Sequence, residues 1–555
     1  MSAQTIKLEI KGMTCEHCAQ TINKKVSQLD GIISNSVSYP EKEAEFEFDA
    51  NIVSKSEIIN SINSIGNYRV VEDLNESRIG EAESNQNKNG NYDLIIIGGG
   101  SAAFAAAIKA SELEKKVLMI NDGLPIGGTC VNVGCVPSKT LIRTAEQFYN
   151  ANHPNFSSIK PGDSKINFKE VISQKTELVD ELRQHKYIDV LKDDSNVMIL
   201  KSQGKLIDKN TVEADGKKYF TEKILIATGS STFIPDIPGL KEINYFTNET
   251  LYELEELPEH LIVIGGRYIA LENAQMFARF GSKVTVLQRS YRILPDEMPD
   301  VTETLKEYLE DEGIEIKTGT KIKSIENKYG KVIVKVSIKD NDEIIVGTHI
   351  FIAAGRKGNT KSFGLENIGV ETHKQSFIKT NEYLQTSTPN IYAAGDVTGE
   401  YLFVYSAAYE GSLAVENMFN ENKTKKDYFI FPWTIFTDPQ VAGVGMDENQ
   451  AYENKIDYEV STIQLKDVPR SIAARNTKGF IKLIRNKEND KLIGARILAP
   501  EGSELLMEIS LAIKYGVTVK ELKQMFHPYL TLSEGVKLAA ISFDKDVKKL
   551  SCCTV

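Results

Sequence analysis

A run of apolar residues, a glycine turn and a helix of small residues follow one another twice in this 555-residue chain. The first copy is YDLIIIGGGSAAFAAAIKA from Tyr92, and the second is HLIVIGGRYIALENAQMFARFG from His260. An apolar run before such a turn and helix is typical of a buried parallel strand in a βαβ unit. Two copies therefore predict two doubly wound α/β domains, each with a place for one dinucleotide.

The first glycine turn has the spacing Gly98-x-Gly100-x-x-Ala103. The first glycine permits a tight turn, the second lets the backbone approach a pyrophosphate, and the alanine lets the helix pack close to the strand. The helix N-terminus then faces the phosphates. The next strand, KVLMI, ends at Asn121 and Asp122. A carboxylate at this place usually binds the adenosine ribose, so Asp122 is the candidate for that contact.

The second turn, Gly265-x-Arg267-x-x-Ala270, carries an arginine in place of its second glycine. That side chain must either point away from a pyrophosphate or bind it. Sites for NAD place a carboxylate after the following strand, whereas this chain has Arg289 and Arg292 there. Guanidinium groups suit a 2′-phosphate, so we predict NADPH rather than NADH. The alternative is that both arginines belong to a solvated loop.

Each of the six cysteines has another cysteine close by in the sequence. A secreted disulfide scaffold would need far more cysteine, whereas thiol pairs in a reducing compartment more often bind soft metals or carry electrons. The chain therefore has three candidate thiol sites. These are the N-terminal pair Cys15 and Cys18, the inner pair Cys130 and Cys135, and the C-terminal pair Cys552 and Cys553.

Charge and hydropathy exclude several classes of partner. The chain has 66 basic and 77 acidic residues, and this net charge of −11 argues against a nucleic-acid surface. No apolar stretch approaches ~18 residues, and the first residues lack a basic segment followed by an apolar run. We therefore expect a cytoplasmic protein that does not insert into a membrane.

The N-terminal region, residues 1–73, alternates in a way that predicts a ferredoxin-like βαββαβ unit with Ser54 at the start of its second helix. Its GMTCEHC segment places Cys15 and Cys18 on a loop that enters a helix, and it resembles the heavy-metal-associated domains. A C-x-x-C segment can also be a thioredoxin-like redox motif, but the element order favours metal capture. Residues 74–91 are polar without an apolar period, which predicts a flexible linker.

The inner pair lies in GGTCVNVGCVPSK, a segment of high specificity. Together with ILIATGS, AAGRKGNT and NIYAAGDVTGE, it resembles the pyridine nucleotide–disulfide oxidoreductases over residues 91–555. The resemblance implies FAD in the first dinucleotide site, NADPH in the second, and a redox dithiol between flavin and substrate. It further implies that Cys135 faces the flavin while Cys130 meets the substrate. The other implied flavin-site residues are Thr129, Lys139 paired with Glu272, and Asp396.

The C-terminal segment bears on the substrate. Family members that reduce disulfides carry a segment similar to HPTLSE, whose His–Glu pair protonates the departing thiol. Here the stretch runs from Tyr529 to Glu534, and His527 stands two residues out of register. A soft metal ion needs thiolates rather than an acid, and the C-terminal pair supplies two. In these features the chain is similar to the Hg(II)-reducing branch of the family.

That similarity implies that the chain reduces Hg(II) to Hg(0) as a homodimer with active sites shared across the interface. The C-terminal pair of one subunit would serve the inner pair of the other, with Tyr187 and Tyr529 lining the inner site. Small thiols or a thiol-bearing donor protein would supply Hg(II), in part through the N-terminal pair. The rival interpretations are a dithiol–disulfide reductase with a metal-binding appendage and a metal carrier without catalysis.

The predicted fold class is therefore α/β, with two Rossmann-like domains, an α+β dimerisation domain and a preceding ferredoxin-like domain. The boundaries follow from where the motifs change. They are a heavy-metal-associated domain at 1–73, a linker at 74–91, an FAD-binding domain at 92–241 and 355–430, an NADPH-binding domain at 242–354, and a dimerisation domain at 431–555.

Overall fold

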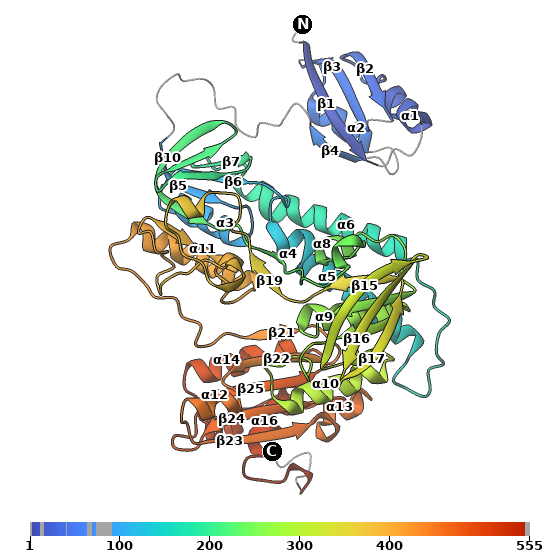
Figure 1. Ribbon diagram of the computed structural model, residues 1–555, viewed down its shortest axis with the longest axis vertical. Helices are drawn as coiled ribbons and strands as arrows, with labels where there is room; N and C mark the ends of the chain where they lie inside the picture. The colour runs from blue at the N-terminus through green and yellow to red at the C-terminus, as the bar shows by residue number, and fades with distance from the viewer. Residues whose placement is uncertain are drawn as a thin grey trace. The chain divides into compact units, whose positions relative to one another are not determined.

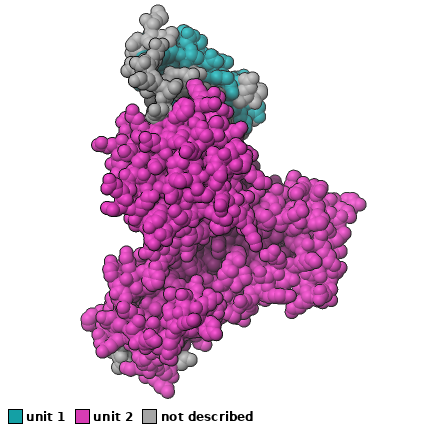
Figure 2. Space-filling model, turned by 60° about the vertical axis from the view of Figure 1, so that its left-hand side comes forward, with its two compact units in different colours: residues 1–89, 198–200 teal, residues 90–197, 201–555 magenta. Residues whose placement is uncertain are grey.

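The computed structural model shown in Figure 1 describes the chain except for a few segments near its ends. The chain forms two compact units, residues 1–89 with 198–200 and residues 90–197 with 201–555 (Figure 2). Cys15, the Cys18 side chain and the C-terminal pair lie outside the described residues. The described residues are 3–11, 16–39, 42–50, 52–63, 69–73 and 91–549.

The first unit is an antiparallel sheet of order β2-β3-β1-β4 with two helices, which confirms the predicted βαββαβ order. Ser54 caps the second helix, because its Oγ accepts the Glu57 N–H at 3.3 Å. Apolar side chains such as Leu8, Ile22 and Phe46 are buried between sheet and helices. The elements are β1 (Ala3–Lys11), α1 (Glu16–Val26), β2 (Ile32–Ser38), β3 (Glu43–Asp49), α2 (Lys55–Asn63) and β4 (Arg69–Asp73).

The second unit begins with a seven-stranded sheet, in which β6, β5, β10 and β20 run parallel. Helices α3 and α11 pack so closely that a Cβ at Gly411 would lie 2.2 Å from the Ala102 carbonyl oxygen. The elements are β5 (Asn91–Ile97), α3 (Ser101–Glu112), β6 (Val117–Asn121), β7 (Val197–Lys201), β8 (Lys205–Asp208), β9 (Thr211–Ala214), β10 (Lys217–Ile226), β20 (Ile391–Ala393) and α11 (Val404–Phe419).

A second parallel sheet, of order β14-β13-β12-β18, follows the second glycine turn. Strands β12, β13 and β18 are mostly buried and apolar, as expected for parallel strands covered by helices. An antiparallel sheet of β15, β16 and β17 adjoins it in sequence. The elements are β12 (His260–Ile264), α9 (Tyr268–Phe280), β13 (Lys283–Leu287), α10 (Pro299–Asp311), β14 (Glu315–Lys317), β15 (Thr320–Lys328), β16 (Lys331–Ile338), β17 (Asn341–Gly347) and β18 (His349–Ile352).

The C-terminal part of the second unit is a five-stranded antiparallel sheet of order β21-β22-β25-β24-β23. Buried Lys482 of this sheet joins it to α10, because its Nζ lies 2.8 Å from Asp300 Oδ2 and 2.6 Å from Glu448 Oε1. No helix in the described ranges could cross a membrane. The elements are β21 (Trp433–Ile435), β22 (Gln440–Gly445), β23 (Tyr458–Gln464), β24 (Phe480–Asn486), β25 (Leu492–Ala499), α14 (Leu506–Lys514), α15 (Val519–Gln524) and α16 (Ser533–Ile541).

Together the two units confirm the predicted fold class: two dinucleotide-binding α/β domains and an α+β domain, preceded by a ferredoxin-like domain.

Candidate functional site

A candidate site is a cavity of about 680 Å³ in the second unit. Its walls come from both parallel-sheet domains and from the C-terminal domain. The inner pair, the first glycine turn and Asp396 line it, as do Arg267 and Tyr268 from the second turn. One cavity therefore brings together the dithiol and both predicted nucleotide sites.

The inner pair spans the junction of two helices. Cys130 belongs to α4 (Gly128–Val133), and Cys135 is the first residue of α5 (Cys135–Asn152). Gly134 lies between the two helices. Both cysteines are free thiols and half-buried. Cys135 therefore stands at the N-terminus of the longer helix, a position that favours a thiolate.

The two thiols differ in protonation. The hydrogen bond from Cys130 and the positive charge of Lys139 hold the pKa of Cys135 below its usual range. The hydrogen bond to Cys135 and burial raise the pKa of Cys130. Cys135 is therefore the thiolate of the pair, and Cys130 carries the shared proton. A thiolate is the form of cysteine that acts as nucleophile and metal ligand.

Lys139 and Glu272 form an ion pair at the wall of this cavity. Lys139 lies one turn after Cys135 on α5, Glu272 lies on α9, and Lys139 Nζ is 2.7 Å from Glu272 Oε2. The other carboxylate oxygen accepts the Phe436 N–H at 2.8 Å. Lys139 Nζ also lies 4.7 Å from the centre of the Phe436 ring. Three domains thus meet at the ion pair that the family resemblance implied.

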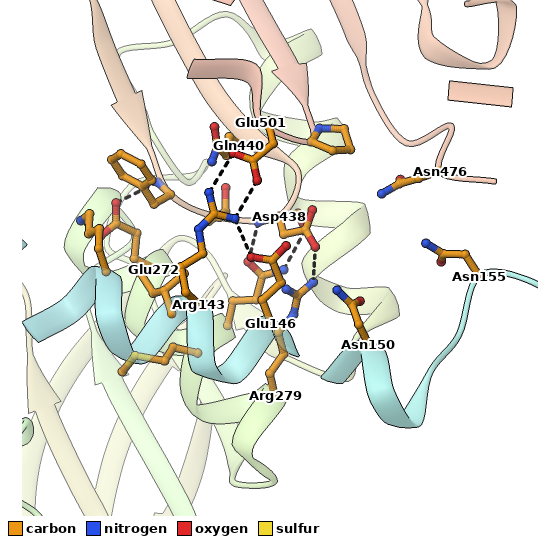
Figure 3. Close-up of a pocket in the computed structure, with 17 residues that line it drawn as sticks. Arg143, Glu146, Asn150, Asn155, Glu272, Arg279, Asp438, Gln440, Asn476 and Glu501 are labelled. Carbon is orange, nitrogen blue, oxygen red and sulfur yellow. Dashed lines mark hydrogen bonds and ion pairs between the residues drawn. The ribbon is translucent and has the colours of Figure 1, made fainter. Parts of the chain in front are cut away.

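A smaller polar pocket of about 220 Å³ lies against the same ion pair, and Lys139, Glu272 and Phe436 line both cavities. Figure 3 shows Arg143 extending from α5 to Glu501, and the two N–H···O distances are 2.7 and 2.8 Å. These contacts join the helix of the inner pair to the C-terminal domain. No sequence motif indicates this pocket, because its residues come from distant segments.

Tyr187 lies close to the inner pair on an unusual turn. The helix α6 (Phe168–Arg183) continues into a π-helix, η1 (Gln184–Ile188), which carries this tyrosine. Its OH lies 3.3 Å from Ser101 Oγ, and its ring meets Phe104 edge-on at 5.0 Å. Burial raises the pKa of Tyr187. Single π-turns inside helices are often found at functional sites.

The first glycine turn fits a dinucleotide. Gly98 has φ +133°, and a Cβ there would lie 2.2 Å from the Ala227 carbonyl oxygen. No side chain caps the α3 N-terminus at Gly100, so its N–H groups face the cavity and can receive phosphates. Ala103 is fully buried in α3, as the motif requires. Two further residues were predicted to contact this dinucleotide. Thr129 lines the cavity, whereas the Asp122 side chain is exposed and is not among the lining residues.

Asp396 lies where the predicted flavin site continues, in the turn after β20. Its Oδ2 accepts the Ser230 hydroxyl at 2.8 Å, and Arg356 Nε lies 3.8 Å away. Burial raises the pKa of Asp396. A cavity lined both by free helix N–H groups and by this carboxyl matches the donor and acceptor set of FAD.

The second glycine turn repeats the first. Gly265 has φ +127°, and a Cβ there would lie 2.3 Å from the Ala353 carbonyl oxygen. Ala270 is fully buried in α9. The Arg267 side chain turns to Asp296, with which it forms an ion pair. Because its guanidinium is paired with Asp296, the Arg267 side chain leaves the glycine turn free to bind a pyrophosphate.

Arg289 and Arg292 follow β13, beyond the second glycine turn. The Arg289 side chain is exposed, Arg292 is half-buried, and neither guanidinium has an ion-pair partner in the parts of the chain that the structure describes. Both are therefore available to a ligand, as the 2′-phosphate of NADPH requires.

Tyr529 and Glu534 lie apart from the cavity of their own chain. Tyr529 is 54% exposed in the loop before α16, and the buried Glu534 side chain accepts the Leu530 N–H at 3.2 Å. His527 Nε2 lies 2.6 Å from Glu508 Oε1 on α14, so its ring faces the core. One chain therefore does not bring Tyr529 to its own inner pair.

Family models match three parts of the chain. The model described as pyridine nucleotide-disulphide oxidoreductase matches residues 92–411. The dimerisation domain of the same family matches residues 431–540. The heavy-metal-associated domain matches residues 7–67. The first match alone covers more than half of the chain.

Similar proteins of known name cover the whole chain. The mercuric reductase of Staphylococcus aureus is 39% identical over 553 residues, which are 100% of both chains. The mercuric reductase of Lysinibacillus sphaericus is 40% identical over 99% of both chains. The solved structure of the HOCl-induced flavoprotein disulfide reductase RclA from Escherichia coli matches with a TM-score of 0.73 and 29% identity. That match covers 81% of this chain and 99% of the other.

Proposed function

The chain belongs to the pyridine nucleotide–disulfide oxidoreductases, and from this premise we propose that it is an NADPH-dependent flavoenzyme that reduces Hg(II) to Hg(0). The observation that carries the proposal is the full-length similarity to mercuric reductases, with the inner pair, both glycine turns and Asp396 lining one cavity. Its biological role is then mercury detoxification.

The residues of the cavity account for the chemistry. The α3 turn and Asp396 would hold FAD, which when bound would supply the route by which the electron pair of NADPH reaches the inner pair. Lys139 stabilises the Cys135 thiolate, and Hg(II) as substrate binds between the two sulfurs once Cys130 has lost its proton. Two electrons convert Hg(II) to Hg(0), while NADPH becomes NADP⁺ and one proton is released. Hg(0) has little affinity for thiolates and leaves.

Delivery of Hg(II) involves the other two thiol pairs in our proposal. The matched dimerisation domain supports a homodimer, and the heavy-metal-associated domain supports metal binding. In the dimer, the C-terminal pair of one subunit passes Hg(II) to the inner pair of the other by thiolate exchange. Small thiols or a thiol-bearing donor protein load the N-terminal pair. The cytoplasm supplies the NADPH that this cycle consumes and the reduced thiols that carry Hg(II).

The exposed position of Tyr529 supports this arrangement of sites. A residue that faces away from its own cavity can reach the cavity of a second subunit in a homodimer. We therefore assign Tyr529 and Glu534 to the shared site, with Tyr187 contributed by the subunit that holds the inner pair. The domain boundaries predicted from the sequence belong to the same proposal.

The experiment that tests the function is NADPH oxidation by the purified yellow protein in excess small thiol. Hg(II), glutathione disulfide and lipoamide are offered in parallel, and Cys130→Ala is the matched inactive control. We expect turnover with Hg(II) alone, together with release of volatile mercury. Turnover with a disulfide and only inhibition by Hg(II) would show instead a dithiol reductase with a metal-binding appendage.

A further inference from the structure

Glu410 is a fully buried carboxyl that the proposed chemistry does not use. It lies on α11, with 0% of its surface exposed. Its Oε2 accepts the Gly395 N–H at 2.7 Å, and its Oε1 accepts the Tyr428 hydroxyl. Glu410 therefore ties together α11, the turn after β20 and the loop before the C-terminal domain.

The turn that Glu410 holds forms part of the cavity wall. Gly395 and Asp396 both line the cavity, whereas Glu410 lies directly behind them. Gly395 has φ +77°, and a Cβ there would lie 3.1 Å from Ala102 Cβ and 3.3 Å from Ala407 Cβ. The turn is thus fixed between α3 and α11 by contact, and its backbone N–H is fixed by Glu410.

The surroundings of Glu410 disfavour its negative charge. Burial raises the pKa of Glu410 to about 7, although the hydrogen bonds from Tyr428 and Gly395 act to lower this pKa. Among the described residues no cation forms an ion pair with it, since the nearby Lys426 pairs with Glu400. Retaining an ionisable group in such a place reduces stability, and a glutamine or an apolar residue would avoid that cost.

We propose that Glu410 is a positioning residue for the flavin, and that its ionised carboxylate fixes the Gly395 N–H and so sets Asp396 at the cavity. The inference rests on FAD binding, which is part of the proposed function. The short N–H···O distance of 2.7 Å is typical of a hydrogen bond to a charged acceptor. Such bonds are stronger than neutral ones, so the turn is held more firmly when Glu410 has lost its proton.

The test measures how much FAD the holoenzyme releases on either side of pH 7. We expect the wild type to retain FAD more tightly above this pH than below it. Glu410→Gln keeps the size of the side chain without the charge, so above pH 7 it should release about tenfold more FAD than the wild type. Below pH 7 the two proteins should behave alike. Glu416→Gln is the matched control on the same helix, because this half-exposed carboxylate pairs with Lys109 and not with Gly395, and it should leave FAD release unchanged.

Tyr428→Phe provides a second measurement that a merely structural role would not affect. The Tyr428 hydroxyl lowers the pKa of Glu410, so its removal should move the midpoint of FAD release to higher pH. This arm also decides the matter if Glu410→Gln does not fold. FAD release that is the same in the wild type and Glu410→Gln at every pH, or a midpoint unchanged in Tyr428→Phe, overturns the inference. A wild-type protein purified without FAD would instead overturn the proposed function.

Discussion

Lys139 stabilises the Cys135 thiolate even though its own charge is shared with Glu272, whose carboxylate lies 2.7 Å away. The two charges act on the sulfur in opposite directions, because Lys139 lowers the pKa of Cys135 and Glu272 raises it. The reactivity of the inner pair is therefore set by a balance between two helices from different domains.

Substitution of either partner should shift this balance in a known direction. We expect Lys139→Met to raise the pKa of Cys135, so that its thiolate appears only at higher pH, and Glu272→Gln to lower it. The measurement is a pH titration of the thiolate absorbance in the reduced enzyme, with the other two thiol pairs replaced by serine. Lys169→Met, which removes an exposed lysine, serves as the control. A shift of both variants in the same direction would contradict the arrangement.

The C-terminal pair should matter only when Hg(II) arrives tightly bound to thiols. A tethered pair of thiols competes for the ion at a high effective concentration. Once the pair is removed, only free thiols at a lower concentration can deliver the ion. We expect Cys552→Ala with Cys553→Ala to slow turnover of thiol-bound Hg(II) by on the order of a hundredfold. Reduction of the inner disulfide by NADPH should remain normal. Ser551→Ala is the control, and equal turnover by the double variant would exclude the relay.

Arg289 should determine the choice between the two nicotinamide dinucleotides. Its exposed guanidinium lies after β13, and a hydrogen bond to a charged phosphate is typically worth ~1.5–3 kcal/mol. We expect Arg289→Ala to raise the KM for NADPH by about tenfold or more and to leave the KM for NADH unchanged. Lys283→Ala, at the start of the same strand, is the control. An unchanged KM for NADPH would place Arg289 in a solvated loop.

Glu410 should make the protein less stable as the pH rises. Its native pKa is raised from 4.5 to about 7, so between these values the native state binds more protons than the unfolded state. Stability from this group therefore falls through that window and levels off above it. At ~1.4 kcal/mol per pH unit, Glu410→Gln should be more stable than the wild type by roughly 3 kcal/mol above pH 7. Denaturant midpoints of the FAD-free protein measure this, and a difference that does not grow with pH would contradict it.

The sequence predicted the parts of the fold that depend on local pattern. An apolar run followed by a glycine turn specifies its strand, turn and helix within about twenty residues, so both nucleotide domains were evident. Ser54 at the start of α2 is likewise a local signal. The pair of Lys139 and Glu272 was implied only by family resemblance, because 133 positions separate its members.

Other features could not be predicted because they depend on tertiary contacts. Tyr187 was expected at the site, but the π-helix that carries it has no sequence signature. The charge of Arg267 is neutralised by Asp296, which only the fold brings near. Glu410 stands in a helix of small apolar residues, and its two partners, the Gly395 backbone N–H and the Tyr428 hydroxyl, come from other segments that only the fold brings near.

The two glycine turns carry the same steric restriction. Gly98 lies against the carbonyl of Ala227, and Gly265 lies against that of Ala353, at nearly equal distances. Each restriction acts inside its own sheet, so damage at one leaves the other unaltered. A chain that loses Gly265 can thus keep its flavin while losing its source of electrons, and a chain that loses Gly98 can bind the reductant but has nowhere to pass its electrons. The two halves of this enzyme can fail separately, although neither is of use alone.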